Sequence, residues 1–321
     1  MNRNQEADVT PSEGHTVEQL PLFTLANGHR VDLVAHVVTG STAGPTLGLV
    51  AGVHGDEPVS VEIVRRIVLE TAPAELAGTI IALPVANPYA VQHRTRNTPL
   101  DMQNLNRSMP GDPDGLLTDQ LADAICQRFV PRCDALIDLH SGGDFATVDY
   151  SYIHDTGADL ARAYGREVLF RGAPHAGSLQ EYALSRGIPV VLSELGGGQH
   201  DNERFVEKGV WGVRNVMRRL GMLSGTAESA PRQVTVDELI TLRPHHGGFL
   251  YSSVSLGHLG KSVPRGELLG RVVSPYTFEV LEELRAPYDP TILVLVRTSF
   301  TTVDPGDYAF MVANGATATP A

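Results

Sequence analysis

Short aliphatic runs that end in turn residues recur through the first two thirds of the chain. Uninterrupted apolar runs of this length are typical of strands that are buried on both faces of a parallel sheet. We predict such strands at 47–53, 79–83, 134–139 and 188–192. Polar residues, glycines or prolines follow each run, which places loops at the carboxyl ends of these strands.

Between these strands the apolar residues return at helical spacing. Pro58 suits the first turn of a helix, and the residues after it carry an apolar face as far as about Glu70. The same spacing predicts helices at 118–129, capped by Thr118, and at 159–169, 179–186 and 203–220. Strands that alternate with helices predict an α/β fold.

The pattern changes at both ends of the chain. Runs at 22–25 and 31–38 flank Asn27-Gly28, which predicts a β-hairpin. After a small, polar linker at 225–231, short β-like runs with turns predict a small all-β domain. These runs lie at 234–236, 248–254, 268–273, 277–280, 292–296 and 308–312. The divisions we expect are a flexible N-terminus (1–20), a large α/β domain (21–224), a small β domain (232–313) and a flexible tail (314–321).

Composition narrows the class of protein. The chain has 321 residues, of which 42% are hydrophobic and 19% charged, and this is typical of a globular protein. A net charge of −12 argues against nucleic-acid binding, although a few arginines in a cleft can still attract an anionic substrate. No apolar run is long enough to span a membrane and residues 1–18 lack the apolar core of a signal peptide, so we expect no membrane partner and a cytoplasmic location.

The cysteine content gives no candidate site, and the sequence does not determine the oligomeric state. Cys126 and Cys133 give neither a disulfide framework nor a cysteine zinc pattern, and we expect both to be buried apolar residues. Composition leaves the oligomeric state open, a homo-oligomer included.

The loops after three predicted strands carry the candidate chemistry. Open α/β sheets bind ligands at the carboxyl ends of their strands, so His54, Glu57, His140 and Glu194 are expected at one edge of the sheet. His54, Glu57 and His140 form a His₂Glu set, which is a known catalytic zinc pattern with one position left for water. Taken singly, each could instead be a solvated or structural side chain.

Glu194 stands beside glycines rather than beside another candidate ligand. A carboxylate near metal-bound water can accept its proton and later deliver it to a leaving amine. A salt-bridged carboxylate and a fourth metal ligand are the alternatives for Glu194.

A long loop at 89–115 is rich in arginine, asparagine and proline. Loops of this length inside a compact domain are usually functional or disordered. Guanidinium groups here could bind a substrate carboxylate, with Asn106 and Arg107 as the first candidates and Arg96 as the second. Asp101 could orient one of these arginines.

Four motifs, taken in order, resemble the succinylglutamate desuccinylase/aspartoacylase family, and most closely its N-acetyl-diaminobutyrate deacetylase-like members. They are Gly-Val-His-Gly-Asp-Glu-Pro (52–58), Asn-Leu-Asn-Arg (104–107), Asp-Leu-His-Ser-Gly (138–142) and Ser-Glu-Leu-Gly-Gly-Gly (193–198). The resemblance covers about residues 20–315. It implies a zinc carboxypeptidase-like fold: a mixed, mostly parallel sheet flanked by helices, with a small C-terminal all-β domain that shapes the mouth of the cleft. Met102 stands where a glycine is usual, which puts the shape of the acyl or side-chain pocket in question.

The resemblance also implies a role for each candidate residue. His54, Glu57 and His140 match the ligands of one Zn²⁺ per chain, and Glu194 matches the acid/base glutamate. Arg107 with Asn106 matches the binders of the substrate carboxylate, and Arg96 matches the arginine that polarises the scissile carbonyl.

The expected function is zinc-dependent removal of an acyl group, acetyl in the first place, from the amine of an N-acyl amino acid or a related small molecule. The alternative is a metallocarboxypeptidase that acts on a peptide C-terminus. A metal-free binding protein on the same fold is a third interpretation, against which the four site residues argue.

Overall fold

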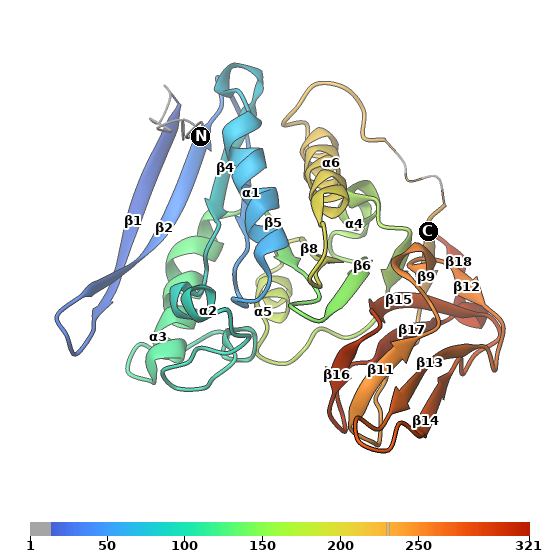
Figure 1. Ribbon diagram of the computed structural model, residues 1–321. Helices are drawn as coiled ribbons and strands as arrows, with labels where there is room; N and C mark the ends of the chain where they lie inside the picture. Colours follow the sequence, from blue (N-terminus) through green and yellow to red (C-terminus); the bar gives the residue numbers. More distant parts are fainter. Residues whose placement is uncertain (1–13, 229, 231) are drawn as a thin grey trace, which may run out of the picture.

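A large mixed sheet runs through the protein, with helices on both of its faces (Figure 1). The computed structural model describes residues 14–228, 230 and 232–321. The helices are α1 Pro58–Glu70, α2 Pro88–His93, α3 Leu117–Ala124, α4 Ala158–Tyr164, α5 Leu179–Ser185 and α6 Glu203–Arg219. The strands up to α6 are β1 His15–Thr24, β2 Arg30–Thr39, β3 Thr42–Val50, β4 Ala77–Leu83, β5 Ala135–His140, β6 Ala146–Tyr152, β7 Val168–Phe170 and β8 Val190–Gly196.

The centre of the sheet confirms the predicted parallel strands. β4, β3, β5 and β8 lie side by side in this order, and each neighbouring pair is parallel. Every residue of β5 is buried, as expected for a strand covered on both faces. The α/β fold with a mixed sheet is therefore confirmed.

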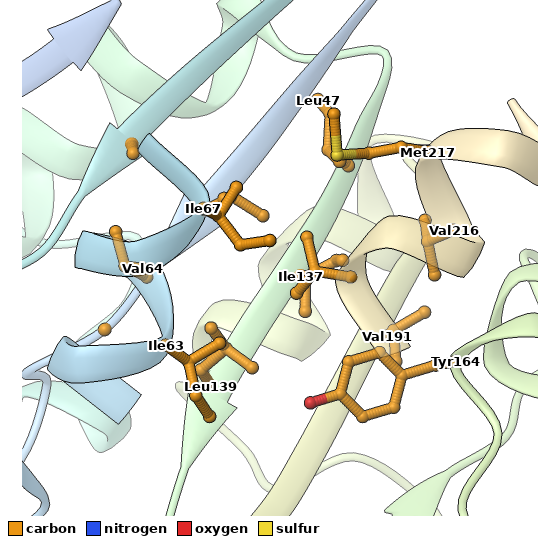
Figure 2. Packing of buried hydrophobic residues seen from close by; sticks show 14 of the residues in the cluster. Leu47, Ile63, Val64, Ile67, Ile137, Leu139, Tyr164, Val191, Val216 and Met217 are labelled. Atoms are coloured by element: carbon orange, nitrogen blue, oxygen red, sulfur yellow. The ribbon is translucent and has the colours of Figure 1, made fainter. Parts of the chain in front are cut away.

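The helices form two layers around this central part. The apolar faces of α1, α4 and α6 pack on one side of the sheet, and Figure 2 shows side chains of α1 and α6 meeting over β5. Apolar residues of α3 and α5 pack on the other side. Glycines let two of these helices approach closely: a Cβ on Gly209 of α6 would lie 2.3 Å from Cδ1 of Ile63 in α1.

The predicted N-terminal hairpin is confirmed as antiparallel strands β1 and β2 at one edge of the sheet (Figure 1). β1 begins at His15, so residues 15–20 belong to the sheet rather than to the lead-in that we expected. Residues 1–13 of that lead-in lie outside the described residues.

The C-terminal part contains the predicted second, antiparallel sheet, in the order β14-β13-β11-β16. Its strands and those around it are β9 Val234–Val236, β10 Leu239–Leu242, β11 Gly248–Ser252, β12 Ser262–Val263, β13 Leu268–Val273, β14 Val280–Arg285, β15 Thr291–Arg297, β16 Thr301–Val303, β17 Phe310–Asn314 and β18 Thr319–Pro320. The run at 277–280 is mainly the turn before β14. Instead of the flexible tail expected at 314–321, β18 pairs with β9.

The C-terminal part also extends the large sheet. β15 pairs with β6, β17 pairs with β15, and β10 pairs with β17. Arg297 of β15 lies opposite Ala146 of β6. This junction brings the C-terminal strands next to the loop that follows β5.

Two local expectations, one in the arginine-rich loop and one just after it, were wrong. Leu116, not Thr118, is the N-cap of α3. Asp101 does not orient an arginine: it accepts hydrogen bonds from the backbone N–H and the hydroxyl of Thr118, both at 2.7 Å. Met102 has a φ of +61°, which explains why glycine suits this position, and its side chain is 70% exposed, away from the cleft described below.

No helix within the described ranges has the length and apolar character needed to cross a membrane.

Candidate active site

The four residues predicted to carry the chemistry come from three neighbouring parallel strands. His54 and Glu57 lie in the loop between β3 and α1, and His140 is the last residue of β5. Glu194 lies within β8 rather than in the loop after it, directly opposite His140 in the sheet. The parallel pairing of β3, β5 and β8 is therefore what brings these residues to one edge.

His54, Glu57 and His140 form a buried cluster, with exposed fractions of 2%, 3% and 2%. Glu57 lies between the histidines: Oε1 is 2.7 Å from Nδ1 of His54, and Oε2 is 2.9 Å from Nδ1 of His140. One ligand atom from each residue falls within 4.8 Å of the other two. Two imidazole nitrogens and a carboxylate oxygen are the donor set of a catalytic zinc site, so these residues fit the metal that the sequence predicts.

The charges inside this cluster favour its compact arrangement. Burial raises the pKa of Glu57, but the adjacent His54 and His140 outweigh it and hold that pKa well below its usual range. Burial lowers the pKa of His140, but Asp138 and Glu57 raise it well above its ordinary value. Glu57 and His140 thus each favour the charged form of the other.

Two further residues lie against the histidines, and neither was assigned a role from the sequence. Nε2 of His54 lies 3.1 Å from Oδ1 of Asn104, and Nε2 of His140 lies 3.1 Å from Oδ1 of Asp138. Such partners fix the ring orientation and the tautomer of ligating histidines. The position of Asp138 could have been predicted, because residues i and i+2 of a strand point to the same face, which places Asp138 beside His140 on β5.

Glu194 contributes a carboxyl group with an unusual protonation equilibrium. Burial is the main cause of a pKa raised to about 8, to which the negative charges of Glu57 and Asp138 add, while His140 and Arg96 oppose it. The side chain keeps some exposure and lines the cleft. A carboxyl group poised near neutral pH suits proton transfer.

Arg96 and Arg107 both line the cleft. Nη1 of Arg96 lies 3.5 Å from Oε1 of Glu57 and 3.4 Å from Nδ1 of His54, so Arg96 approaches the predicted metal site itself. Burial is the main cause of a lowered pKa for Arg107, and the positive charge of Arg96 acts in the same direction. Two guanidinium groups that line the same cleft can bind an anionic group of a substrate.

Asn106 is buried and its carboxamide already has protein partners. Its Oδ1 accepts a hydrogen bond of 2.9 Å from the backbone N–H of Leu179, and its Nδ2 lies 3.2 Å from Nε2 of His140. Nη1 of Arg107 donates to the Asn106 carbonyl oxygen at 2.6 Å. Asn106 therefore joins Arg107 to the start of α5 and lies against His140, while contact between its side chain and substrate stays a prediction.

A cleft of about 720 Å³ opens over these residues. Its walls include residues that the sequence analysis left out, among them Tyr150, Tyr152, His175, Arg297, Asp304 and Tyr308. These residues come from β6, the segment before α5, the end of β15 and the loop between β16 and β17, and only the tertiary structure brings them to the site.

Comparison with known proteins gives a consistent result. The model of the succinylglutamate desuccinylase/aspartoacylase catalytic domain matches residues 43–220, more than half of the chain. N-alpha-acetyl-L-2,4-diaminobutyric acid deacetylase from Halomonas elongata is 29% identical over 275 residues, which cover 80% of this chain and 79% of that protein.

Solved structures agree over nearly the whole chain. A succinylglutamate desuccinylase from Silicibacter sp. TM1040 has a TM-score of 0.83 and 26% identity, with 98% of this chain and 99% of the other covered. The product-bound ectoine utilization protein EutE (DoeB) from Ruegeria pomeroyi has a TM-score of 0.83 and 25% identity, with 94% and 95% covered. The chain belongs to the succinylglutamate desuccinylase/aspartoacylase family.

Proposed function

We propose that this protein is a zinc-dependent amidohydrolase that removes an acyl group, acetyl in the first place, from the amine of an N-acyl amino acid. The observation that carries the proposal is the buried His54–Glu57–His140 cluster beside Glu194, at the base of a cleft in a member of this family. The names of the relatives support the reaction class.

One Zn²⁺ per chain would be held by Nδ1 of His54, Nδ1 of His140 and the carboxylate of Glu57. When bound, the metal supplies a Lewis acid that polarises a carbonyl and lowers the pKa of a bound water. Asn104 and Asp138 keep both imidazoles in the orientation that this requires.

Glu194 moves the proton. Its carboxylate accepts a proton from the attacking water while the water oxygen bonds to the acyl carbon. As the carbon–nitrogen bond breaks, Glu194 returns the proton to the departing amine, so that a carboxylic acid and a free amino acid leave. The raised pKa suits both steps, since Glu194 must gain and lose the proton within one cycle.

The two arginines interact with different negatively charged groups of the substrate. Arg96 lies beside Glu57 and His54, where it can stabilise the oxyanion that develops on the scissile carbonyl. Arg107, positioned through Asn106, binds the carboxylate of the substrate and so fixes the orientation of the acyl group.

The charge of the cleft indicates the kind of amino acid. Asp56, Asp144 and Asp304 line it, and none of them has an ion pair within the described part of the chain. Oδ1 of Asp56 is buried without a hydrogen-bond partner, which is costly until a donor arrives. We propose that the substrate carries a positive group in addition to its carboxylate, as the name of the Halomonas elongata relative indicates for that protein.

A substrate comparison tests the proposal. The purified chain is incubated, with zinc and after chelation, with N-acetyl-2,4-diaminobutyrate, N-acetyl-aspartate, N-succinyl-glutamate and a dipeptide. We expect release of a free amine from the acetylated cationic compound, loss of this release after chelation and recovery with zinc. Release only from the dipeptide would indicate peptide-bond hydrolysis in place of deacylation, and release that persists without metal would overturn the zinc-dependent mechanism.

A further inference from the structure

The last residue of β15 is a buried arginine that the proposed reaction does not use. Arg297 is 5% exposed and lies opposite Ala146, where the C-terminal strands meet β6. Burial lowers its pKa, and the carboxylates of Asp307 and Asp304 act in the opposite direction. Burial of a guanidinium group is costly unless its N–H donors are satisfied, so the hydrogen-bond partners of Arg297 indicate its role in the structure.

The donors of Arg297 all reach one C-terminal segment, residues 301–308. Nε donates to the hydroxyl of Thr301 at 3.2 Å, and Nη2 donates to the carbonyl oxygen of Thr302. Nη1 lies 3.3 Å from Oδ2 of Asp307 and 3.5 Å from the carbonyl oxygen of Tyr308. The guanidinium thus holds both ends of the segment.

The same guanidinium group also contacts the loop that follows β5. Its guanidinium carbon lies 4.9 Å from the centre of the Phe145 ring, in a cation–π arrangement. Phe145 ends the segment that begins directly after His140, and it lines the cleft although it is 52% exposed. Arg297 therefore touches two walls of the same cleft at once.

Stability alone gives no reason for an arginine at this position. Replacing buried charged groups by apolar side chains of similar volume is often neutral or stabilising. A planar fork of five donors can instead fix several oxygens at defined places, which no apolar side chain does. Thr302, Asp307 and Tyr308, which this fork holds, all line the cleft.

We propose that Arg297 is a positioning residue for substrate binding: it joins segment 301–308 to Phe145 and so sets the width of the cleft over the metal site. It touches none of the groups that transfer protons or bind metal. Loosening Arg297 should weaken substrate binding while leaving the chemical step largely intact. The kinetic part of this inference rests on the proposed function.

The test compares the wild-type chain with Arg297→Lys, Phe145→Leu and the control Arg271→Lys. Arg271 is an arginine of β13 that pairs with Glu283 away from the cleft. Amide hydrogen exchange in peptides covering 298–309 is measured first, against peptides covering 47–53. In Arg297→Lys we expect exchange at 298–309 to accelerate about tenfold, with the core strand unchanged, because the loss is local. Arg271→Lys should exchange at the wild-type rate in both sets of peptides.

Kinetics supply the second measurement. For Arg297→Lys we expect KM to rise about tenfold and kcat to change less than about threefold. This pattern indicates that the substrate and the transition state are bound more weakly by the same amount, so that the chemical step itself is not slowed. Phe145→Leu keeps every hydrogen bond of Arg297 and should raise KM about threefold, so it carries the test if Arg297→Lys does not fold.

Unchanged exchange at 298–309, or a fall in kcat with KM unchanged, would overturn the role of Arg297. An unchanged KM in folded Phe145→Leu would do the same. If the wild-type chain hydrolyses no N-acyl amino acid, the proposed function fails at that point, and Arg297 is judged by the exchange measurement alone.

Discussion

The histidines of the candidate metal site depend on neighbours that touch no metal. Asp138 is fully buried, and its Oδ1 lies 3.1 Å from Nε2 of His140. Replacing it with asparagine keeps the volume but removes the negative charge beside the imidazole. We expect Asp138→Asn to lower zinc affinity about 10- to 100-fold, measured by competition with a chelating indicator.

A matched control separates this effect from a general change of charge. Asp159 is an exposed aspartate that pairs with Arg219 on the surface, so Asp159→Asn should bind zinc like the wild type. Equal zinc affinity in Asp138→Asn and the wild type would show that Asp138 does not support His140.

Glu194 offers a second prediction at this scale. Glutamine fills the same space but cannot accept the proton of an attacking water. We expect Glu194→Gln to lower kcat about 10²- to 10⁴-fold, the usual contribution of general acid–base catalysis, while zinc content stays at one per chain.

The control for this change is Glu203→Gln. Glu203 pairs with Arg66 on the surface, and its loss should leave kcat unchanged. Near-normal turnover by zinc-loaded Glu194→Gln would show that another group carries the proton.

The strands show which features of the fold could be predicted from the sequence. That β3, β5 and β8 are strands was predictable because uninterrupted apolar runs mark buried strands, and their parallel pairing then brings His54, Glu57, His140 and Glu194 together. The placement of Glu194 inside β8 was not predictable, since the apolar run ends at Leu192 whereas the pairing of β8 with its neighbours continues through Ser193 and Glu194.

Helix caps and the far wall of the cleft depend on distant contacts. Thr118 has the side chain of a good N-cap, but Asp101 takes both its hydroxyl and its backbone N–H, and α3 begins one residue earlier, at Leu117. Arg297 and Tyr308 reach the cleft only because β15 pairs with β6, and no local pattern encodes a pairing between residues so far apart.

The loop between β3 and α1 yields a prediction of its own. A Cβ on Gly55 would lie 1.8 Å from the backbone carbonyl oxygen of Ala90 in α2, and Gly55 N–H donates to Thr95 at 2.8 Å. Because backbone cannot give way like a side chain, Gly55→Ala must displace the loop that holds His54 and Glu57. We expect a loss of about 1–3 kcal/mol in the free energy of unfolding, the usual cost of overpacking, together with weaker zinc binding.

Urea unfolding and a zinc titration check this expectation. Gly257→Ala serves as the control, because its new Cβ would meet only the Ser255 hydroxyl, at 3.5 Å. A Gly55→Ala chain with wild-type stability and zinc affinity would mean that the loop can shift without disturbing its ligands.

Across the whole molecule, the two proposed domains share one sheet. We propose 21–224 as the catalytic domain and 232–313 as a β domain that shapes the mouth of the cleft. β6 lies between β8 of the first part and β15 of the second. The catalytic part therefore has no free edge at β6, and the two parts should unfold together.

A chain that ends at residue 224 tests this coupling. It would lose Val236, Ile292, Val294, Leu295 and Ala313, which pack with Val148, Tyr150 and Tyr152 in one buried cluster. The edge of β6 would then present unpaired backbone groups beside an apolar surface, a combination that promotes aggregation. We expect the shortened chain to aggregate or to unfold without a sharp transition, measured by gel filtration and circular dichroism during urea unfolding. A monomer with one steep transition would show that the catalytic part folds alone, and the C-terminal strands would then serve the cleft without supporting the fold.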